Sequence, residues 1–179
     1  MLKMSSIKNT PPSAFVNPLQ EQVFDLLSQQ NVNYNCIENE AVHSMEECAA
    51  IESALEVEIR KTIVLNNRKK TQFYLLVMPS GKAFNSKDFS EQLGCQRLSF
   101  TSPDRMEALL GVQPGSATIM SLLNDSDEIV QLVIDQDVVD DQWFGCNTGT
   151  NTCHIKMSTD DLLNKVITTT GHTPMVVKL

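Results

Sequence analysis

KTIVLNNRKKTQFYLLVMPSGK, which runs from Lys61 to Lys82, contains two apolar runs separated by the polar segment NRKKT. Short runs rich in β-branched and aromatic residues on either side of a polar turn predict two strands, here at residues 60–66 and 72–78. Both runs are apolar along almost their whole length, as is typical of central strands that are covered on both faces. The stretch therefore predicts a pair of strands at the centre of a sheet.

Helix start signals recur on both sides of this pair of strands. The predicted helices open with capping residues, namely Asn17, Ser44, Ser102 and Ser158. Helices are predicted at residues 17–31, 44–55, 86–94, 102–111 and 158–171, and further strands at 32–37, 97–100 and 129–134. Residues 135–143 are expected to form an acidic connection, and 146–157 to begin as a loop and end as a strand. This mixture without a regular βαβ repeat predicts an α+β fold with one mixed central sheet flanked by helices.

The size and composition of the chain favour a single globular domain. It has 179 residues, of which 41% are hydrophobic and 20% charged. We expect a mobile polar tail at residues 1–16, followed by one domain at 17–179. No apolar run approaches the ~18 residues that a membrane-spanning helix needs, so no membrane contact is expected.

The cysteines and histidines favour neither disulfides nor a metal site. Five cysteines is an odd number, and the sequence contains no C-x-x-C. The three histidines are widely scattered, without metal-ligand spacing. We therefore expect a reducing, cytoplasmic location, no metal and no cofactor. Cys153 and His154 are adjacent in a predicted strand and so point to opposite faces, which argues against a Cys–His catalytic pair.

The basic residues are concentrated in one part of an acidic chain. Residues 60–105 hold nine Lys and Arg against three acidic residues, a net charge of +6 in a chain whose total is −8. A basic strip on a negative body suits selective binding of a polyanion, whereas non-specific DNA binders are usually basic throughout. The alternative is a solvated turn whose lysines provide solubility and protect a sheet edge.

Common catalytic motifs are missing from the sequence. It contains no G-x-S-x-G, H-E-x-x-H, Walker A or G-x-G-x-x-G pattern. An enzyme of this kind would rely on positioning and hydrogen bonds. Gly115 and Ser116 could offer backbone N–H groups to a carbonyl, although a plain Pro-Gly turn is the alternative. Lys61, at the edge of its apolar run, either snorkels outward or faces a cleft.

Several segments together resemble a known family. They are RLSFTSPDRMEALLGVQPGSAT (97–118) with LLND (122–125), KTIVLNN (61–67), the NT of TNTC (151–152) and GHTP (171–174). The chain resembles the YbaK/prolyl-tRNA synthetase-associated domain family from about Gln20 to its C-terminus. Within that family it is most similar to the free-standing proteins that deacylate mischarged Ala-tRNA(Pro). The resemblance implies a barrel-like mixed sheet flanked by helices, with a pocket for the aminoacylated end of tRNA.

The resemblance also implies roles for individual residues. Lys61 would be the principal catalytic residue, with Gly115 and Ser116 supplying backbone donors. The implied substrate-binding residues are Thr62, His43, Arg97, Met120, Asn147, Asn151, Thr152, Gly171 and His172. Arg68, Lys69 and Lys70 would hold the acceptor stem of the tRNA through phosphate contacts.

The chain departs from the family pattern at several of these positions. Many relatives read PFGL after the glycine loop, where this chain has residues 119–122, IMSL. Many carry HP shortly before NT, where this chain has Asn147 and Thr148. Thr62 stands where Asn is frequent, and His43 stands where an aromatic residue is usual. These changes bear on which amino acid the pocket accepts.

The resemblance predicts a trans-editing aminoacyl-tRNA deacylase. A pocket shaped for proline cannot exclude the smaller alanine sterically, so a second hydrolytic site has to remove the errors. The expected partner is tRNA, with prolyl-tRNA synthetase as a further candidate and DNA excluded. Two alternatives remain open. One is a non-catalytic tRNA- or synthetase-binding module, and the other is a deacylase for mischarged Cys, Ser or Thr.

Overall fold

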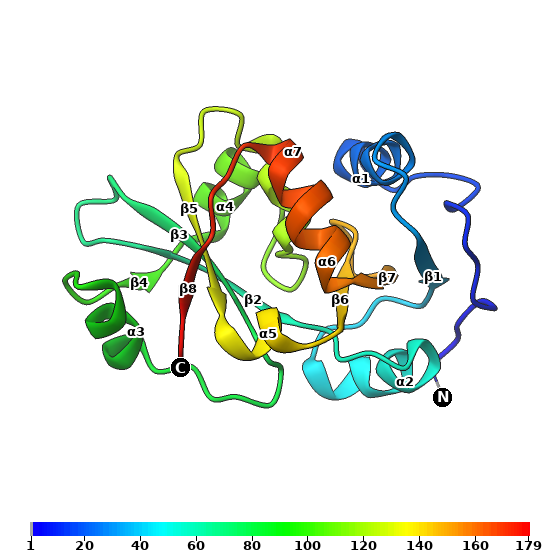
Figure 1. Cartoon of the computed structure of the whole chain (residues 1–179), viewed down its shortest axis with the longest axis horizontal. Helices are drawn as coiled ribbons and strands as arrows, with labels where there is room; N and C mark the ends of the chain where they lie inside the picture. The colour runs from blue at the N-terminus through cyan, green and yellow to red at the C-terminus, as the bar shows by residue number, and fades with distance from the viewer. Residues whose placement is uncertain (1) are drawn as a thin grey trace.

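The strands of the computed structural model, which describes residues 2–179, form two β-sheets (Figure 1). A five-stranded sheet has the order β4-β2-β3-β5-β8, and a three-stranded sheet has the order β1-β7-β6. The first comprises β2 (Lys61–Asn66), β3 (Phe73–Met78), β4 (Ser99–Phe100), β5 (Val130–Asp135) and β8 (Met175–Val177). The second comprises β1 (Tyr34–Glu38), β6 (Trp143–Asn147) and β7 (Cys153–Ser158).

The pair of strands predicted from residues 61–82 lies inside the five-stranded sheet. β2 and β3 are antiparallel, with Lys61 opposite Met78 and Asn66 opposite Phe73. β5 runs parallel to β3, and β8 runs parallel to β5, so the sheet is mixed. The predicted α+β class, with mixed strands and flanking helices, is confirmed. The described strands do not close into a barrel. They form two separate sheets, and the three-stranded sheet meets the start of β2 only through an isolated bridge between Ile59 and Gly145.

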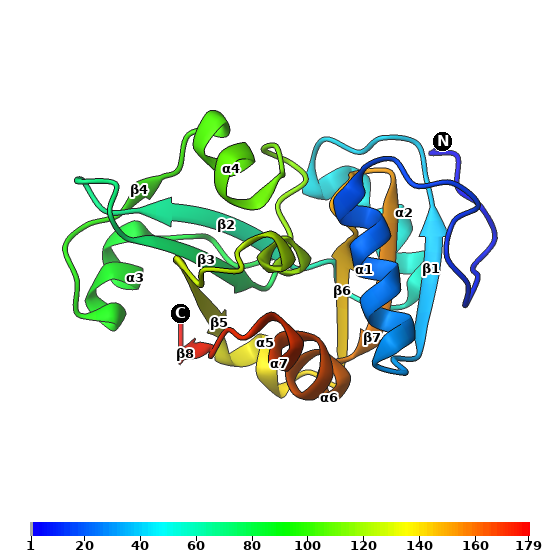
Figure 2. The same cartoon turned by 90° about the horizontal axis from the view of Figure 1, so that it is seen from above.

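Helices cover both sheets. They are α1 (Pro18–Gln29), α2 (Met45–Leu55), α3 (Ser86–Leu93), α4 (Pro103–Leu110), α5 (Gln136–Asp140), α6 (Thr159–Asp161) and α7 (Thr168–Thr170), with a 3₁₀ turn at Ile119–Asn124 and a π-helical turn at Leu162–Ile167. Figure 2 shows α1 and α2 on opposite faces of the three-stranded sheet. No helix within residues 2–179 is both long enough and apolar enough to cross a bilayer.

One hydrophobic core joins the two sheets, and two smaller cores lie under single helices. The main core includes Phe24 of α1, Leu75 of β3 and Ile155 of β7. A second core packs α2 against the other face of the three-stranded sheet, through residues that include Ile37, Ile51 and Ile59. A third packs α3 against the five-stranded sheet, through Leu65, Leu76 and Phe89. The start of α2 is thereby fixed beside the start of β2.

Most predicted helix ends follow from local hydrogen bonds. The side chains of Asn17, Ser44 and Ser158 accept bonds from the backbone N–H three residues ahead, at 2.9, 3.2 and 3.1 Å. Gly94 and Gly111 end α3 and α4 in the left-handed conformation. Ser102 occupies the N-cap of α4 but makes no side-chain capping bond.

The structure differs from the sequence prediction between residues 135 and 147. The expected acidic connection contains the short helix α5, and the expected loop after it begins with strand β6. The sequence WFGCN of β6 has no period-2 alternation. Its burial comes from pairing with β7, with which it forms a hairpin, and from the approach of residues 57–60, which is a long-range contact.

The segment before α1 runs alongside β1. Ser5 N–H donates to the carbonyl of Glu38 at 2.8 Å, and Lys8 N–H to that of Cys36 at 2.9 Å. Residue 1 of the predicted tail lies outside the described residues, and the mobility of residues 1–16 stays a prediction.

Gly145 yields a test of the junction between the sheets. A Cβ on Gly145 would lie 2.7 Å from the carbonyl oxygen of Glu58 and 2.8 Å from Cγ1 of Val57. Gly145→Ala should therefore lower the free energy of unfolding by about 1–3 kcal/mol, as overpacking does. Gly81→Ala is the matched control, because a Cβ there would meet nothing within 4 Å. Urea unfolding of both variants checks this, and equal midpoints would contradict it.

Candidate active site

A pocket of about 220 Å³ opens where the two sheets and the start of α2 meet. It is lined by Val42, His43, Ser44, Met45, Cys48, Ile59, Arg60, Lys61, Thr62, Gly115, Ala117, Asn147 and His154. The lining comes from the start of α2, the start of β2, the loop before the 3₁₀ turn and the adjoining ends of β6 and β7 (Figure 1). Five predicted site residues, His43, Lys61, Thr62, Gly115 and Asn147, are brought together here.

Lys61 is held in place by the backbone of a neighbouring turn. Its Nζ donates to the main-chain carbonyl of Lys82 at 2.5 Å. The Lys82 side chain in turn bonds Asp135 Oδ2, which is fully buried, and Asp137 Oδ2, both at 2.8 Å. The hydrogen bond from Lys82 lowers the pKa of Asp137 below its usual value. The carbonyl that receives Lys61 is thus itself anchored.

The same turn is fixed from its other side by Glu58. Oε1 of Glu58 accepts from the N–H of Ser80 at 2.6 Å and from its hydroxyl at 2.7 Å. The other oxygen of Glu58 bonds the buried guanidinium of Arg60, which also bonds Asp141 at 2.5 Å and the carbonyl of Trp143 at 3.1 Å. Arg60 therefore ties the start of β2 to the start of β6.

The glycine loop is attached to β6 rather than free to fold over a ligand. Thr118 Oγ1 donates to the Asn147 carbonyl at 3.0 Å, and Asn147 Nδ2 donates to the Ala117 carbonyl at 3.2 Å. Gly115 has φ +89°, in the region that favours glycine. The N–H of Ser116, expected to face the substrate, instead donates to the Gln113 carbonyl at 2.9 Å. The Pro-Gly turn closes on that bond, so Ser116 is not a donor to the pocket in this structure.

Several predicted substrate-binding residues lie outside the pocket lining. Met120 is fully buried in the main core, and Arg97 is exposed next to β4. Asn151 Nδ2 bonds the Val42 carbonyl at 2.9 Å, and the Thr152 hydroxyl bonds that of Thr150 at 2.9 Å. Asn151 and Thr152 thus support the pocket wall rather than face its interior.

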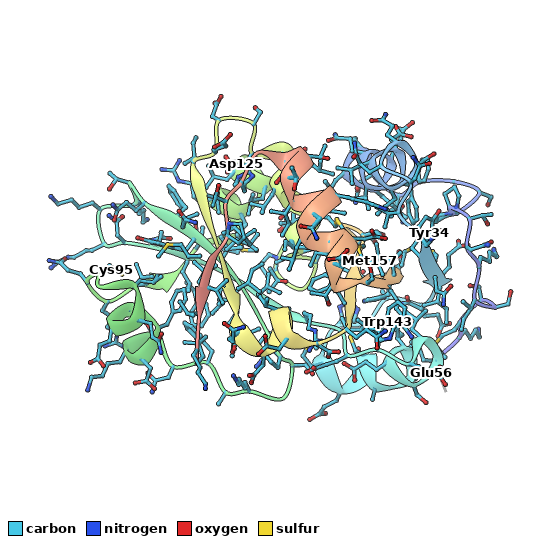
Figure 3. All side chains as sticks on the ribbon, viewed as in Figure 1. Tyr34, Glu56, Cys95, Asp125, Trp143 and Met157 are labelled. Carbon is cyan, nitrogen blue, oxygen red and sulfur yellow. The ribbon has the colours of Figure 1, made fainter. Side chains whose placement is uncertain are left out.

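Gly171 and His172 lie at another edge of the molecule. Gly171 ends α7 in the left-handed conformation, and His172 is buried with Nε2 2.8 Å from Asp125 Oδ2. Figure 3 labels Asp125 at the upper edge and Glu56, which follows α2, at the lower edge. The predicted role of Gly171 and His172 at the pocket is therefore not supported, because their contacts stabilise the turn before β5.

The basic turn occupies the far end of the β2–β3 hairpin. Asn67 Oδ1 accepts from the backbone N–H of Thr71 and Gln72 at 2.9 and 3.2 Å, which builds the turn. Arg68, Lys69 and Lys70 are exposed on it. With a rise of ~3.3 Å per residue, the length of β2 separates them from Lys61 by roughly 17 Å.

His154 lines the pocket although the sequence prediction gave it no role there. It stands opposite Asn147 in the β6–β7 pair, and its side chain is buried. Cys153 points the other way, into the main core, as the alternation of strand faces predicts. The available signal was the histidine's place on the polar face of β7. It could not be used without knowing which face lines the pocket.

Two of the buried cysteines, Cys48 and Cys146, have the character of structural thiols. Cys36, Cys48, Cys146 and Cys153 are buried, and Cys95 is partly buried. Cys48 lines the pocket, but burial raises the pKa of its thiol above its usual value, with a further contribution from the nearby Glu52. Burial raises the pKa of Cys146 to about 12. Both thiols stay protonated at neutral pH and are poor nucleophiles. Within residues 2–179 no three His, Cys, Asp or Glu side chains gather as a metal site.

Comparison with known proteins finds relatives that align with most of the chain. Prolyl-tRNA editing protein ProX of Acetoanaerobium sticklandii is 27% identical over 160 residues, which cover 89% of this chain and 97% of the relative. A Danio rerio protein, prolyl-tRNA synthetase associated domain-containing protein 1, is 24% identical over 161 residues, 89% of this chain and 86% of the relative. Both alignments extend over nearly the whole chain.

A solved structure shares the fold of this chain, and a family model matches its sequence. The structure, described as a candidate trans-editing enzyme for prolyl tRNA synthetase, superposes with a TM-score of 0.63 at 15% identity, over 92% of this chain and 99% of that one. At that identity it shows the shared fold. The model of the aminoacyl-tRNA editing domain matches residues 39–165, the greater part of the chain. The resemblance seen in the sequence is confirmed, and the chain belongs to the aminoacyl-tRNA editing domain family.

Proposed function

We propose that this protein is a trans-editing deacylase that hydrolyses the ester of mischarged tRNA, with Ala-tRNA(Pro) as its main substrate. The observation that carries the proposal is the pocket at the sheet junction, where the anchored ammonium of Lys61 stands beside small apolar side chains. The relative named as a prolyl-tRNA editing protein supports the choice of tRNA. Prolyl-tRNA synthetase, which would generate the error, is the proposed partner, in the cytoplasm.

The size of the pocket suits a small amino acid. Its volume of about 220 Å³ lies below the ~300–1,000 Å³ of pockets for drug-sized ligands. Ile59, Cys48 and Ala117 supply apolar surface in the lining. A pocket that fits the alanine side chain and sterically excludes the larger proline ring would supply the choice that a proline-shaped pocket cannot make.

The chemistry that the pocket supports is attack by water on an activated ester. An ammonium group carries three N–H donors, and Lys61 uses one of them on Lys82. The other two can bind a phosphate or the oxyanion that develops on the ester carbonyl. The protonated thiol of Cys48 does not favour a covalent intermediate, so water is the attacking group. Lys61 stabilises the developing charge during that attack.

One prediction of this proposal concerns Lys61. Lys61→Ala should lower kcat/KM for Ala-tRNA(Pro) by about a hundredfold or more, because a preorganised donor is lost. The variant should stay folded, since Lys61 is the first residue of its strand and belongs to none of the three hydrophobic cores. Loss of labelled amino acid from a panel of tRNAs carrying Ala, Cys, Ser, Thr or Pro measures both rate and specificity.

A matched control and two contrary outcomes make that test decisive. Lys165→Ala removes a lysine that bonds Asp161 and the Asn31 carbonyl, away from the pocket, and should turn over normally. Wild-type protein that binds tRNA but releases no amino acid would be a binding module. Faster release of Cys, Ser or Thr than of Ala would reassign the substrate.

A second prediction concerns the turn that carries Arg68, Lys69 and Lys70. We expect these side chains to contact phosphates of the acceptor stem. Each neutralised phosphate adds ~0.9 to the slope of log affinity against log salt, so changing all three to Ala should flatten that slope by roughly two to three. The choice of amino acid should not change, because the pocket makes it.

The control for this prediction removes the same charge elsewhere. Lys3, Lys8 and Lys165 form ion pairs with Glu40, Glu38 and Asp161 on other parts of the surface. Their joint replacement by Ala should leave the slope within about one unit of the wild-type value. Binding of tRNA is measured at several salt concentrations, and parallel lines for wild type and the turn variant would show that the turn does not touch RNA.

A further inference from the structure

His154 is a buried histidine in the lining of the pocket. The residue is only 2% exposed, it stands opposite Asn147 in the β6–β7 pair, and it lines the pocket together with Lys61. The lining contains no carboxylate. The histidines are therefore the groups in it that could accept a proton from water at neutral pH.

A chain of amide hydrogen bonds fixes the tautomer of this ring. Asn39 Nδ2 donates to the carbonyls of Glu40 and Asn151, at 2.8 and 3.0 Å. Its Oδ1 is therefore turned toward His154, whose Nδ1 lies 2.9 Å away. An amide oxygen only accepts hydrogen bonds, so Nδ1 carries the proton and Nε2 keeps its lone pair.

The free nitrogen faces the pocket. Within residues 2–179, Nε2 of His154 makes no hydrogen bond. The atom is not fully buried either, since it is not one of the buried side-chain atoms that lack a partner. Burial lowers the pKa of His154 to about 4, so the ring is neutral under physiological conditions. Besides His43, the other titratable or charged groups of the lining are Arg60 just before β2, Lys61 on β2 and Cys48 on α2.

His43 is the competing candidate. Its residue is exposed, and within the described chain its ring makes no hydrogen bond, since only its backbone N–H bonds Glu47. A ring without a fixed partner has neither a set tautomer nor a set orientation. The geometry therefore favours His154.

We propose that His154 is the catalytic base of this site, an inference that rests on the proposed deacylase function. Nε2 accepts a proton from a water molecule while the water oxygen bonds to the ester carbonyl carbon. The tetrahedral intermediate then collapses, the bond to the ribose oxygen breaks, and the imidazolium returns the proton to that oxygen. The second water proton leaves with the carboxyl group, so one water is consumed and His154 ends neutral.

Three variants test the assignment on Ala-tRNA(Pro). His154→Gln should lower kcat by about 10²–10⁴-fold, the usual contribution of a general base, with KM changed by less than about threefold. Lys165→Ala, at a lysine that lies away from the pocket and has no proposed role in the site, is the control and should retain turnover within about threefold. Near-normal kcat in folded His154→Gln, or a large loss in His43→Gln alone, overturns the proposal.

The pH profile gives a readout that a structural role would not move. Asn39→Asp places a carboxylate beside Nδ1–H, which favours the imidazolium, so the acidic limb of kcat should shift to higher pH by about one unit or more. An unshifted limb in a folded variant overturns the proposal. Should that variant not fold, the tautomer is read directly from ¹⁵N-labelled wild type. Nε2 must then show the chemical shift of an unprotonated nitrogen, and a protonated Nε2 overturns the proposal.

These outcomes separate the base from the function itself. Wild-type protein that hydrolyses no member of the tRNA panel refutes the deacylase. Active wild type with an active His154→Gln variant refutes only the base.

Discussion

The site depends on the backbone contact between Gly145 and the residues that lead into β2. Ile59 and Gly145 form a parallel bridge, and Arg60 N–H donates to the Gly145 carbonyl at 2.9 Å. A side chain at 145 would collide with the Glu58 carbonyl, so only glycine permits this approach. Lys61 follows directly on one side of the contact, and Asn147 follows on the other. The width of the pocket is therefore set by main chain, and its chemistry by the side chains that project from each sheet.

Several polar side chains around the pocket donate hydrogen bonds to neighbouring main-chain carbonyls. Asn147 binds the Ala117 carbonyl, Asn151 binds that of Val42, and Asn39 binds that of Asn151. Loops with little regular structure are fixed in this way, because a buried backbone acceptor has to be satisfied. Segments that mark the family, such as PGSAT and NT, thus include residues that hold the walls as well as residues that face the substrate.

The sequence was informative where structure is decided locally. The β2–β3 pair, the caps at Asn17 and Ser44, and the glycine ends of α3 and α4 follow from neighbouring residues, and the structure has them. The approach of residues 57–60 to β6 and the division into two sheets depend on contacts between distant segments, which no local pattern encodes. The family resemblance predicted Lys61, Thr62 and Gly115 as site residues, and all three line the pocket. It also predicted Met120 and His172, which lie outside the lining, because a motif position does not reveal whether a side chain faces the core or the cavity. His154 was missed for the same reason.

The anchoring of Lys61 also affects how the site meets its substrate. A lysine that is free in water carries about 2 kcal/mol of rotamer entropy, part of which is lost whenever its ammonium is immobilised. Here the bond to the Lys82 carbonyl, itself backed by the ion pair with buried Asp135, already restricts that side chain. The entropy is given up when the chain folds rather than when RNA arrives. An ester in the pocket therefore encounters an ammonium group that needs little further ordering.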